Sequence, residues 1–354
     1  MSSVEEEFKD ARICVVGGAG FVGSNLIVSL LGSSPREIVV IDNLLSSERE
    51  NLPDASKVAF IEGSAADDTV LSRIEDDFDY VFHLATFHGN QNSIHDPLAD
   101  HENNTLTTLK LFNRLKSFKR LRKVVYASAG CTVAKKTYGN AVATTEDDPV
   151  SLFLDSPYQI SKIIGEFYAN YFFKQHGLPV VKARFQNVYG PREILGAGKW
   201  RGTPATVWRN VIPTFIYKAL KEQPLPLENK GEATRDFIYV EDIVRGLEAC
   251  ALRGTPGEVY NLGSGVETSI ARLAELIIEI SGSSSRFLYL PRRKWDNSGK
   301  RFAAIEKAKW ELGFVAQIPI EEGLRKTIGW TRQHLDFIEG CIRKHDQKMA
   351  AFRD

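Results

Sequence analysis

The chain has 354 residues, of which 43% are hydrophobic and 25% are charged. This composition is typical of a folded globular protein with a large core, divided into one large and one smaller lobe. Lys and Arg together number 45, as do Asp and Glu, so the balanced charge gives no indication of a nucleic-acid partner or an acidic membrane. No apolar run approaches the roughly 20 residues of a membrane span, and the acidic start predicts no signal peptide.

The cysteines indicate a reducing compartment. Cys14, Cys131, Cys250 and Cys341 lie far apart in the sequence and form no CxxC pair and no cluster with histidines. This spacing predicts no metal site and fits reduced thiols. We therefore expect a cytoplasmic location.

Three glycines follow the first apolar run. Residues 12–16 are predicted to form a buried strand, and residues 21–31 a helix. Gly17 permits a tight turn between them, Gly20 lets backbone N–H groups approach a pyrophosphate, and Gly23 lets the helix pack on the strand. Because a helix N-terminus favours negative charge, this turn is predicted to bind the pyrophosphate of a dinucleotide.

A carboxylate ends the next apolar run. Residues 37–41 are predicted to form the neighbouring parallel strand, and Asp42 follows 19 residues after Gly23. At this place a carboxylate accepts hydrogen bonds from the adenosine ribose hydroxyls and repels a 2′-phosphate, so NAD is predicted rather than NADP. A glycine turn without a ligand is the alternative, and its context between strand, helix and Asp42 disfavours it.

Strand-like and helix-like segments alternate through the first half of the chain. The predicted strands are 12–16, 37–41, 57–61, 79–84, 122–127 and 179–184, and the predicted helices include 21–31, 67–75, 97–119 and 157–176. This alternation predicts an α/β fold of the Rossmann type, in which helices cover both faces of a doubly wound parallel sheet.

Prolines divide the second half into shorter pieces, which predict a smaller C-terminal substrate lobe over the carboxyl edge of the sheet. We assign residues 1–186 to the cofactor-binding domain, with a returning segment near 234–263. Residues 187–233 and 264–354 are assigned to the substrate lobe.

The segment from Ser156 onward combines a helix start with a reactive pair. Ser156 suits an N-cap, Pro157 the first helical position, and Gln159 a capping box. Tyr158 and Lys162 then lie one helical turn apart on the same face. A nearby ammonium stabilises a phenolate and lowers the tyrosine pKa from about 10 toward neutrality, so that Tyr158 can act as a base.

Together these motifs resemble the extended short-chain dehydrogenase/reductase family, and within it the NAD-dependent sugar-nucleotide epimerases and dehydratases. The resemblance covers nearly the whole chain, with GGAGFVG, IDNL, VFHLAT, YQISK, RFQNVYGP, ATRDFIYVEDIV and YNLGSG in the family's order. It implies a homodimer formed through two helices of each subunit, here 97–119 and 157–176.

The resemblance also implies roles for individual residues. Tyr158 takes a proton from a sugar hydroxyl while NAD accepts hydride from the same carbon, and Lys162 holds the nicotinamide ribose. Asn104 supports the backbone of the active site. The implied cofactor-binding residues are Gly17, Gly20, Phe21, Val22, Gly23, Asp42, Asn43, Leu84, Ala85, Thr86, Tyr158 and Lys162.

One departure from the family pattern concerns the hydroxyl that assists the tyrosine. The family has Ser or Thr where this chain has Ala129. Either Ser128 or Thr132 replaces that hydroxyl, or Tyr158 works without it, at a cost of about 1–3 kcal/mol. Because successive side chains of a strand point to opposite faces, Thr132 is preferred over Ser128.

The same loop discriminates among the reactions of the family. Its 4,6-dehydratases have an Asp-Glu pair, and its decarboxylases a Glu, where this chain has Gly130 and Cys131. A dehydratase needs an acid to expel the 6-hydroxyl. The sequence therefore predicts an NAD-dependent nucleotide-sugar epimerase, namely a UDP-sugar 4-epimerase that acts through a transient 4-keto intermediate. A dehydratase, a UDP-glucuronate decarboxylase and a weakly catalytic nucleotide-sugar-binding protein remain alternatives.

The resemblance places Asn187, Arg235, Arg293 and Asp296 at the diphosphate and ribose of the sugar nucleotide. Guanidinium groups suit this place because they bind phosphate oxygens bidentately. The segment at 199–204, within the irregular loop at 193–210, has no counterpart in the family pattern. If it closes over the sugar, Arg201 or Lys199 could bind a carboxylate and Trp200 could stack on the ring; a structural loop is the alternative.

Overall fold

The structure is a computed structural model, and it describes residues 4–130, 137, 139–292 and 299–352. Its centre is a parallel sheet of seven strands in the order β10-β6-β5-β4-β1-β2-β3. The strands are β1 Arg12–Val16, β2 Glu37–Asp42, β3 Val58–Glu62, β4 Tyr80–His83, β5 Lys123–Ala129, β6 Val180–Phe185 and β10 Val259–Leu262. The strand order reverses between β1 and β4, which is where such sheets bind their ligands. The predicted doubly wound α/β fold is confirmed.

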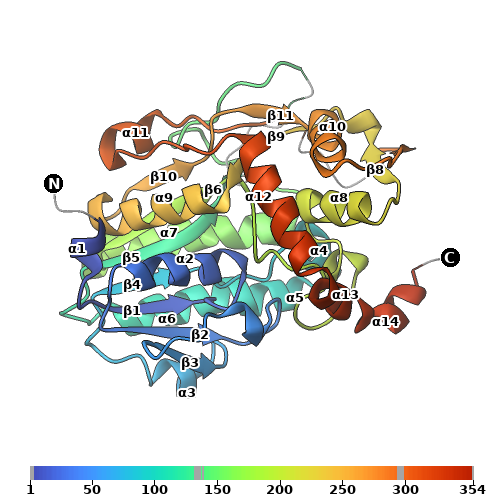
Figure 1. Ribbon diagram of the computed structural model, residues 1–354. Coiled ribbons are helices and arrows are strands. Elements are labelled where there is room, and N and C mark those ends of the chain that lie inside the picture. The colour runs from blue at the N-terminus through green and yellow to red at the C-terminus, as the bar shows by residue number, and fades with distance from the viewer. Residues whose placement is uncertain (1–3, 131–136, 138, 293–298, 353–354) are drawn as a thin grey trace.

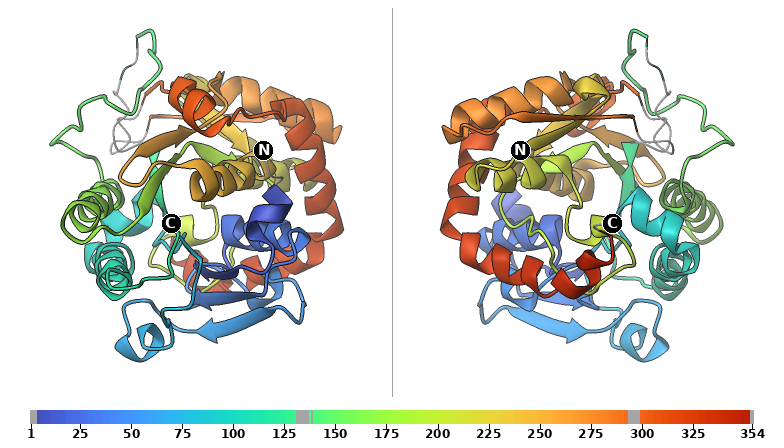
Figure 2. Two further views of the ribbon diagram at one scale, coloured as in Figure 1. Left: turned by 90° about the vertical axis from the view of Figure 1, so that its left-hand side faces the viewer. Right: turned by 90° about the vertical axis from the view of Figure 1, so that its right-hand side faces the viewer.

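Helices cover both faces of this sheet. Helices α2 (Phe21–Gly32) and α9 (Val240–Arg253) lie on one face, and α6 (Thr107–Leu115) and α7 (Pro157–His176) on the other, as the two side views show (Figure 2). Alternate residues of β1 explain this arrangement, since Ile13 and Val15 belong to one buried cluster and Cys14 and Val16 to the other. Both faces of the strand are therefore apolar, as expected for a parallel sheet.

The prediction of one helix over 97–119 is wrong in its details. The segment begins as α5 (Pro97–Asp100), continues as a π-helical turn, η2 (His101–Leu106), and ends as α6 at Leu115. The predicted helix at 67–75 is likewise shorter, because α3 spans only Asp68–Leu71. A further short helix, α4 (Asn90–His95), precedes α5, and α1 (Val4–Phe8) precedes the first strand.

The second half of the chain adds two small sheets above the carboxyl edge (Figure 1). One contains β7, β9 and β11, and the other pairs β8 with β12. The strands are β7 Asn187–Tyr189, β8 Leu225–Glu228, β9 Thr234–Tyr239, β11 Glu267–Ser269 and β12 Phe287–Leu290. The helices are α8 Val211–Leu220, α10 Ile270–Ser281, α11 Glu306–Leu312, α12 Ile320–Gln333, α13 Leu335–Arg343 and α14 Asp346–Ala350. Short 3-10 turns among the described residues are η4 Pro204–Thr206 and η5 Asn229–Gly231 here, and η1 Arg49–Asn51 in the first half. A separate apolar cluster lies among these elements.

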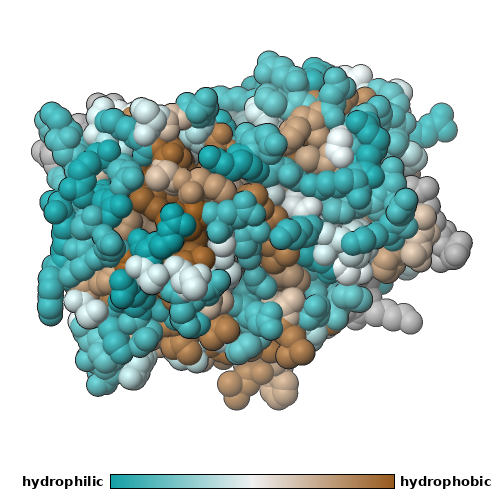
Figure 3. Space-filling view, turned by 90° about the horizontal axis from the view of Figure 1, so that it is seen from below, coloured by the Kyte–Doolittle hydropathy of each residue, from teal (hydrophilic) through white to brown (hydrophobic). Residues whose placement is uncertain are grey.

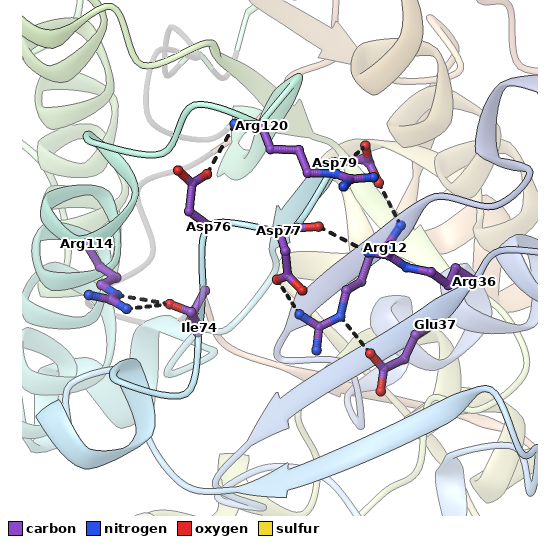
Figure 4. A network of polar contacts seen from close by, with 9 residues as sticks. All are labelled: Arg12, Arg36, Glu37, Ile74, Asp76, Asp77, Asp79, Arg114 and Arg120. Atoms are coloured by element: carbon purple, nitrogen blue, oxygen red, sulfur yellow. Dashed lines mark hydrogen bonds and ion pairs between the residues drawn. The ribbon is translucent and has the colours of Figure 1, made fainter.

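A polar network joins the opposite, amino edge of the sheet (Figure 4). The Asp79 carboxylate accepts a hydrogen bond from the backbone N–H of Arg12 at 2.9 Å and lies 3.4 Å from the Nε of Arg120. The Arg12 guanidinium in turn donates to Glu37 at 2.6 Å and pairs with Asp77. The network joins the starts of β1, β2 and β4 to one another. Each of these charged groups has a partner.

Seen from below, the surface is hydrophilic over most of its outline, with hydrophobic residues gathered near the centre and at one margin (Figure 3). Within the described residues, no helix is both long enough and apolar enough to cross a membrane.

Candidate active site

A cavity of about 770 Å³ lies at the carboxyl edge of the seven-stranded sheet. This volume falls within the range of small-molecule and cofactor sites. All the residues predicted to bind the cofactor line it, from both sides of the switch point: Gly17, Gly20, Phe21, Val22, Gly23, Asp42, Asn43, Leu84, Ala85, Thr86, Tyr158 and Lys162.

The glycine turn has the shape that a pyrophosphate requires. Gly17 has a φ of +85°, and a Cβ there would collide with the backbone of Ala85. A Cβ on Gly23 would lie 2.5 Å from the Gly17 carbonyl oxygen. Helix α2 begins directly after Gly20, which provides no side chain to cap its free N–H groups. These donors are therefore left for an anion, so the turn fits the pyrophosphate of a dinucleotide.

Asp42 ends β2 beside this turn. Its carboxylate accepts hydrogen bonds from the N–H groups of Ala19 and Leu44 at 3.0 and 2.9 Å, and from the Ser47 hydroxyl at 2.9 Å. Burial raises the pKa of Asp42, and these hydrogen bonds oppose that shift. Asp42 also lines the cavity, where a carboxylate at the end of the second strand of such a fold accepts hydrogen bonds from a ribose hydroxyl.

The start of α7 positions the reactive pair. The Ser156 hydroxyl accepts from the Gln159 N–H, and the Gln159 side chain accepts from the Asp155 N–H at 3.1 Å. The Lys162 ammonium donates to the Ala127 carbonyl oxygen at 2.9 Å and lies 6.0 Å from the centroid of the Tyr158 ring. Tyr158 and Lys162 therefore share one helical face at the cavity. The hydrogen bond to Ala127 holds the ammonium group near the end of β5.

Asn104 links this helix to the loop that follows β4. Its amide oxygen accepts from the Phe87 N–H at 2.6 Å and from the Thr86 hydroxyl at 3.1 Å. Its amide nitrogen donates to Asp100 at 2.8 Å and to Ser161 at 3.1 Å. The side chain thus joins the loop at 86–87, the π-helical turn and α7.

Ser128 and Ala129 differ in their surroundings. The Ser128 hydroxyl donates to Glu166 at 2.5 Å, and the same carboxylate forms a buried ion pair with Arg184 at 2.8 Å. Both residues line the cavity, but Ala129, at the end of β5, offers it only a methyl group. Thr132 lies outside the described residues. The structure thus shows Ser128 in a hydrogen bond with the interior of the protein.

The opposite end of the cavity is rich in arginine. Asn187 on β7 and Arg235 on β9 both line it, and Arg235 donates to the carbonyl oxygens of Thr234 and Gly299 at 2.6 and 2.7 Å. Arg292 and Arg301 also line this end, although the sequence analysis missed them. The predicted residues Arg293 and Asp296 lie outside the described residues.

Comparison with known proteins identifies the family. The model of the NAD dependent epimerase/dehydratase family matches residues 13–263. The chain belongs to this family. Its cofactor is therefore NAD, as predicted, and the glycine turn and Asp42 are the residues that fit it.

Several relatives resemble the chain over almost its full length. The Bordetella bronchiseptica enzyme WbmF in complex with NAD+ is 60% identical, with 98% of this chain and 99% of that chain covered and a TM-score of 0.88. The same enzyme in complex with NAD+ and UDP gives 59% identity, 99% and 100% coverage, and a TM-score of 0.89. A UDP-glucose 4-epimerase of Mycolicibacterium smegmatis is 31% identical, with 91% of this chain and 98% of the relative covered.

This epimerase/dehydratase family member has a polar wall that the sequence analysis missed. The wall consists of His88, Glu193, Arg209 and Asn210, all of which line the cavity. Asn210 donates its amide N–H to Glu193, and its amide oxygen lies 3.2 Å from the Nε2 of His88. The His88 ring meets the Tyr158 ring edge to face, with centroids 5.9 Å apart. No local motif links these residues, because they come from distant parts of the chain.

Burial shifts the pKa of two members of this wall. It raises the pKa of Glu193 to about 7, although the hydrogen bond from Asn210 and the charge of Arg209 oppose that shift. It lowers the pKa of His88 to about 4, against the hydrogen bond with Asn210. His88 is therefore neutral near pH 7.

Residues 199–201 lie behind the wall rather than in it. None of the three is among the described residues that line the cavity. Trp200 packs on His345 and Phe352 near the end of the chain, with centroids 5.8 and 6.0 Å apart. The Arg201 side chain is buried, and its Nε and Nη1 atoms have no hydrogen-bond partner among the described residues. Residues 199–201 thus pack away from the cavity, whereas Glu193, Arg209 and Asn210 of the same loop line it.

Proposed function

We propose that the chain is an NAD-dependent 4-epimerase of a UDP-linked sugar. The observation that supports this most is the position of Tyr158 and Lys162, which face one cavity that extends from the glycine turn to Arg235. A cofactor at one end and a nucleotide sugar at the other would meet at the tyrosine. The Bordetella enzyme binds UDP together with NAD+, which supports a UDP-linked substrate here.

Tyr158 and Lys162 have different roles in the proposed oxidation of the sugar. Tyr158 accepts the proton of the sugar 4-hydroxyl, and the Lys162 ammonium stabilises the resulting phenolate through its charge. Bound NAD supplies the acceptor, and later the donor, of the hydride at C4. Rotation of the 4-keto sugar, return of the hydride to the opposite face of C4 and return of the proton from Tyr158 to the 4-oxygen would complete the epimerisation, with no net redox change.

Dehydration and decarboxylation remain the rival reactions. Relatives named UDP-glucuronic acid decarboxylase and dTDP-glucose 4,6-dehydratase are 29% and 27% identical to this chain. Gly130 and Cys131 occupy the places where the resemblance puts the carboxylates of those enzymes. A dehydratase without an acid at this place has no group to protonate the departing 6-hydroxyl. The sequence of this loop therefore favours epimerisation.

A panel of nucleotide sugars tests the reaction. The purified protein is incubated with UDP-glucose, UDP-N-acetylglucosamine, UDP-glucuronate and dTDP-glucose, and the products are resolved by chromatography and mass spectrometry. Epimerisation yields a new peak of unchanged mass. Loss of water or carbon dioxide would replace the proposal by a dehydratase or decarboxylase, and binding without conversion would identify a nucleotide-sugar-binding protein.

The helper hydroxyl is proposed to be Thr132. Ser128 already donates its hydroxyl to Glu166, whereas Ala129 offers none. Thr132→Val is expected to slow NADH formation in the first half-reaction by about tenfold with unchanged substrate binding. Ser128→Ala is the matched control. A silent Thr132→Val together with a slow Ser128→Ala would assign the role to Ser128 instead.

We also propose that two copies associate through α6 and α7. Helix α7 exposes Ile160, Phe167 and Tyr171 on one face, with exposed fractions of 44%, 57% and 52%. A row of apolar side chains at this spacing is typical of a helix face that packs against another element. Phe167→Glu should convert a dimer into a monomer in light-scattering measurements. A monomeric wild-type protein would refute this part of the proposal.

The two parts of the cavity suggest a division of the chain. We propose that residues 1–186 and a segment near 234–263 hold NAD, whereas residues 187–233 and 264–354 hold the sugar nucleotide. The participation of β10 in the large sheet supports the returning segment.

A further inference from the structure

His88, Asn210 and Glu193 form a chain of hydrogen bonds along the cavity wall. Asn210 lies directly before α8, whereas Gly89 separates His88 from α4, and both helices lie on the same side of the molecule (Figure 1). Asn210 donates to Glu193 and faces the Nε2 of His88 at 3.2 Å. Glu193 and Asn210 lie at the two ends of the irregular loop at 193–210.

The direction of these hydrogen bonds follows from their chemistry. An ionised carboxylate only accepts, so Asn210 must turn its NH₂ group toward Glu193 and its oxygen toward His88. An amide oxygen also only accepts, so the Nε2 of His88 must bear the proton. In a neutral imidazole the other nitrogen, Nδ1, is then an acceptor.

Burial raises the pKa of Glu193 to about 7, and the Asn210 hydrogen bond and the charge of Arg209 oppose that shift, so the carboxylate is ionised at pH 8. Arg209 is the cation that acts on it, and Arg209 is itself held by the carbonyl oxygens of Ser46 and Ala197 at 2.9 and 2.7 Å. The second oxygen of Glu193 is buried and has no partner among the described residues. Glu193 therefore lies within the wall and acts on the cavity through Asn210 and His88.

We propose that this chain of hydrogen bonds fixes His88 as the Nε2–H tautomer, so that its Nδ1 accepts a hydrogen bond from a hydroxyl or amide N–H of the sugar. The inference extends the proposed function, because it defines a specificity-determining residue beside Tyr158. The His88 and Tyr158 rings are in contact, so the sugar group that His88 binds lies next to the carbon that is oxidised. Glu193 and Asn210 are positioning residues for this contact.

Three substitutions of His88 separate hydrogen bonding from ring packing. His88→Asn retains a polar atom near the position of Nδ1, His88→Gln retains one near Nε2, and His88→Phe retains only the ring. His101→Asn, at an exposed position, is the control for a histidine replacement outside the cavity. The probes are UDP-glucose and UDP-N-acetylglucosamine, with UDP alone as the ligand that lacks the sugar.

Calorimetry at pH 8 is expected to show UDP bound equally by all variants. His88→Phe should weaken the binding of both UDP-sugars by about tenfold, measured relative to the binding of UDP. Binding should recover in part in His88→Asn and not at all in His88→Gln. If the ring only packs on Tyr158, His88→Phe will instead be the mildest change, and the proposal fails. A loss of NAD from His88→Phe would place the contact on the cofactor and also overturn it.

Glu193→Gln tests the direction of the chain of hydrogen bonds. A glutamine can donate to the oxygen of Asn210, so the Asn210 amide can turn and His88 can take the Nδ1–H tautomer. Nitrogen-15 spectra of the histidine ring should show Nε2–H in the wild type and a changed tautomer in Glu193→Gln. Nδ1–H in the wild type would refute the proposal. These spectra need no turnover, so they stand if the epimerase assignment fails.

Discussion

Buried polar groups at the two ends of the sheet differ in whether they have hydrogen-bond partners. At the amino edge, the charged side chains of the network around Arg12 and Asp79 bind one another and the strand ends (Figure 4). At the carboxyl edge, buried polar atoms without hydrogen-bond partners among the described residues are concentrated in one segment. They belong to Glu193, Arg201, Arg209 and Thr214, with His83 as the single exception elsewhere.

This difference indicates what each edge contributes. A satisfied polar network stabilises and specifies the fold, whereas an unsatisfied buried polar group reduces stability. Such groups persist at sites where function requires them. The amino edge is therefore expected to determine stability, and the carboxyl edge to determine activity.

Loss of the tyrosine hydroxyl should have the largest effect on activity. Tyr158→Phe removes the proton acceptor but keeps the ring against His88. Turnover is expected to fall by about 10²- to 10⁴-fold, while the melting temperature and NAD content stay unchanged. Steady-state kinetics on the substrate identified by the panel provides the measurement. Unchanged turnover would show that Tyr158 is not the base.

Two buried arginines, both near the carboxyl edge, test how a charged partner affects stability. Arg184 forms an ion pair with Glu166, so Arg184→Met leaves a buried carboxylate unpaired and is expected to cost about 3–5 kcal/mol of unfolding free energy. Arg201 has no such partner, so Arg201→Met should leave the stability unchanged or raise it. Denaturant titration of both variants measures the difference. Equal destabilisation by both substitutions would contradict the view that Arg184 stabilises the fold and Arg201 does not.

Removal of Arg235 should weaken the nucleotide site. Its guanidinium lines the end of the cavity away from the glycine turn. Arg235→Ala is expected to weaken binding of the UDP-sugar by about 10- to 100-fold, with NAD content unchanged. Calorimetric titration with UDP measures the effect. If NAD is lost while UDP affinity stays the same, Arg235 belongs to the cofactor site.

Asp79→Ala should have a smaller effect, confined to stability. The substitution removes the acceptor for the Arg12 backbone N–H at the amino edge. We expect a loss of about 1–3 kcal/mol in unfolding free energy and unchanged kcat and KM. A change in KM at unchanged stability would mean that the two edges are coupled.

The sequence predicted best the features that have local causes. The strand at 12–16 and the helix at 157–176 have the predicted bounds, because an apolar run defines the first and an N-cap, a proline and a C-terminal glycine define the second. The cofactor was predictable for the same reason, since Gly17 and Asp42 belong to one continuous strand–turn–helix–strand unit.

Features that join distant residues could not be predicted in this way. His88, Glu193 and Asn210 meet only after the loop at 193–210 has packed beside α4, and no residue spacing records that contact. Likewise, the pairing of Ser128 with Glu166 depends on how β5 and α7 are aligned. The π-helical turn was missed because His101–Leu106 contains no proline or glycine that would indicate a break in a helix.

That turn also has a consequence for insertions and deletions in the chain. A π-helical turn contains about one residue more than the α-helical turn it replaces, and each residue of an α-helix turns the chain by about 100°. Deletion of a single residue within His101–Leu106 would let α5 and α6 join as one regular helix. Asn104 would then rotate away from Phe87 and Ser161, and the loop beside Tyr158 would lose its anchor. Gene variants shorter by this one codon should therefore fold but fail in catalysis.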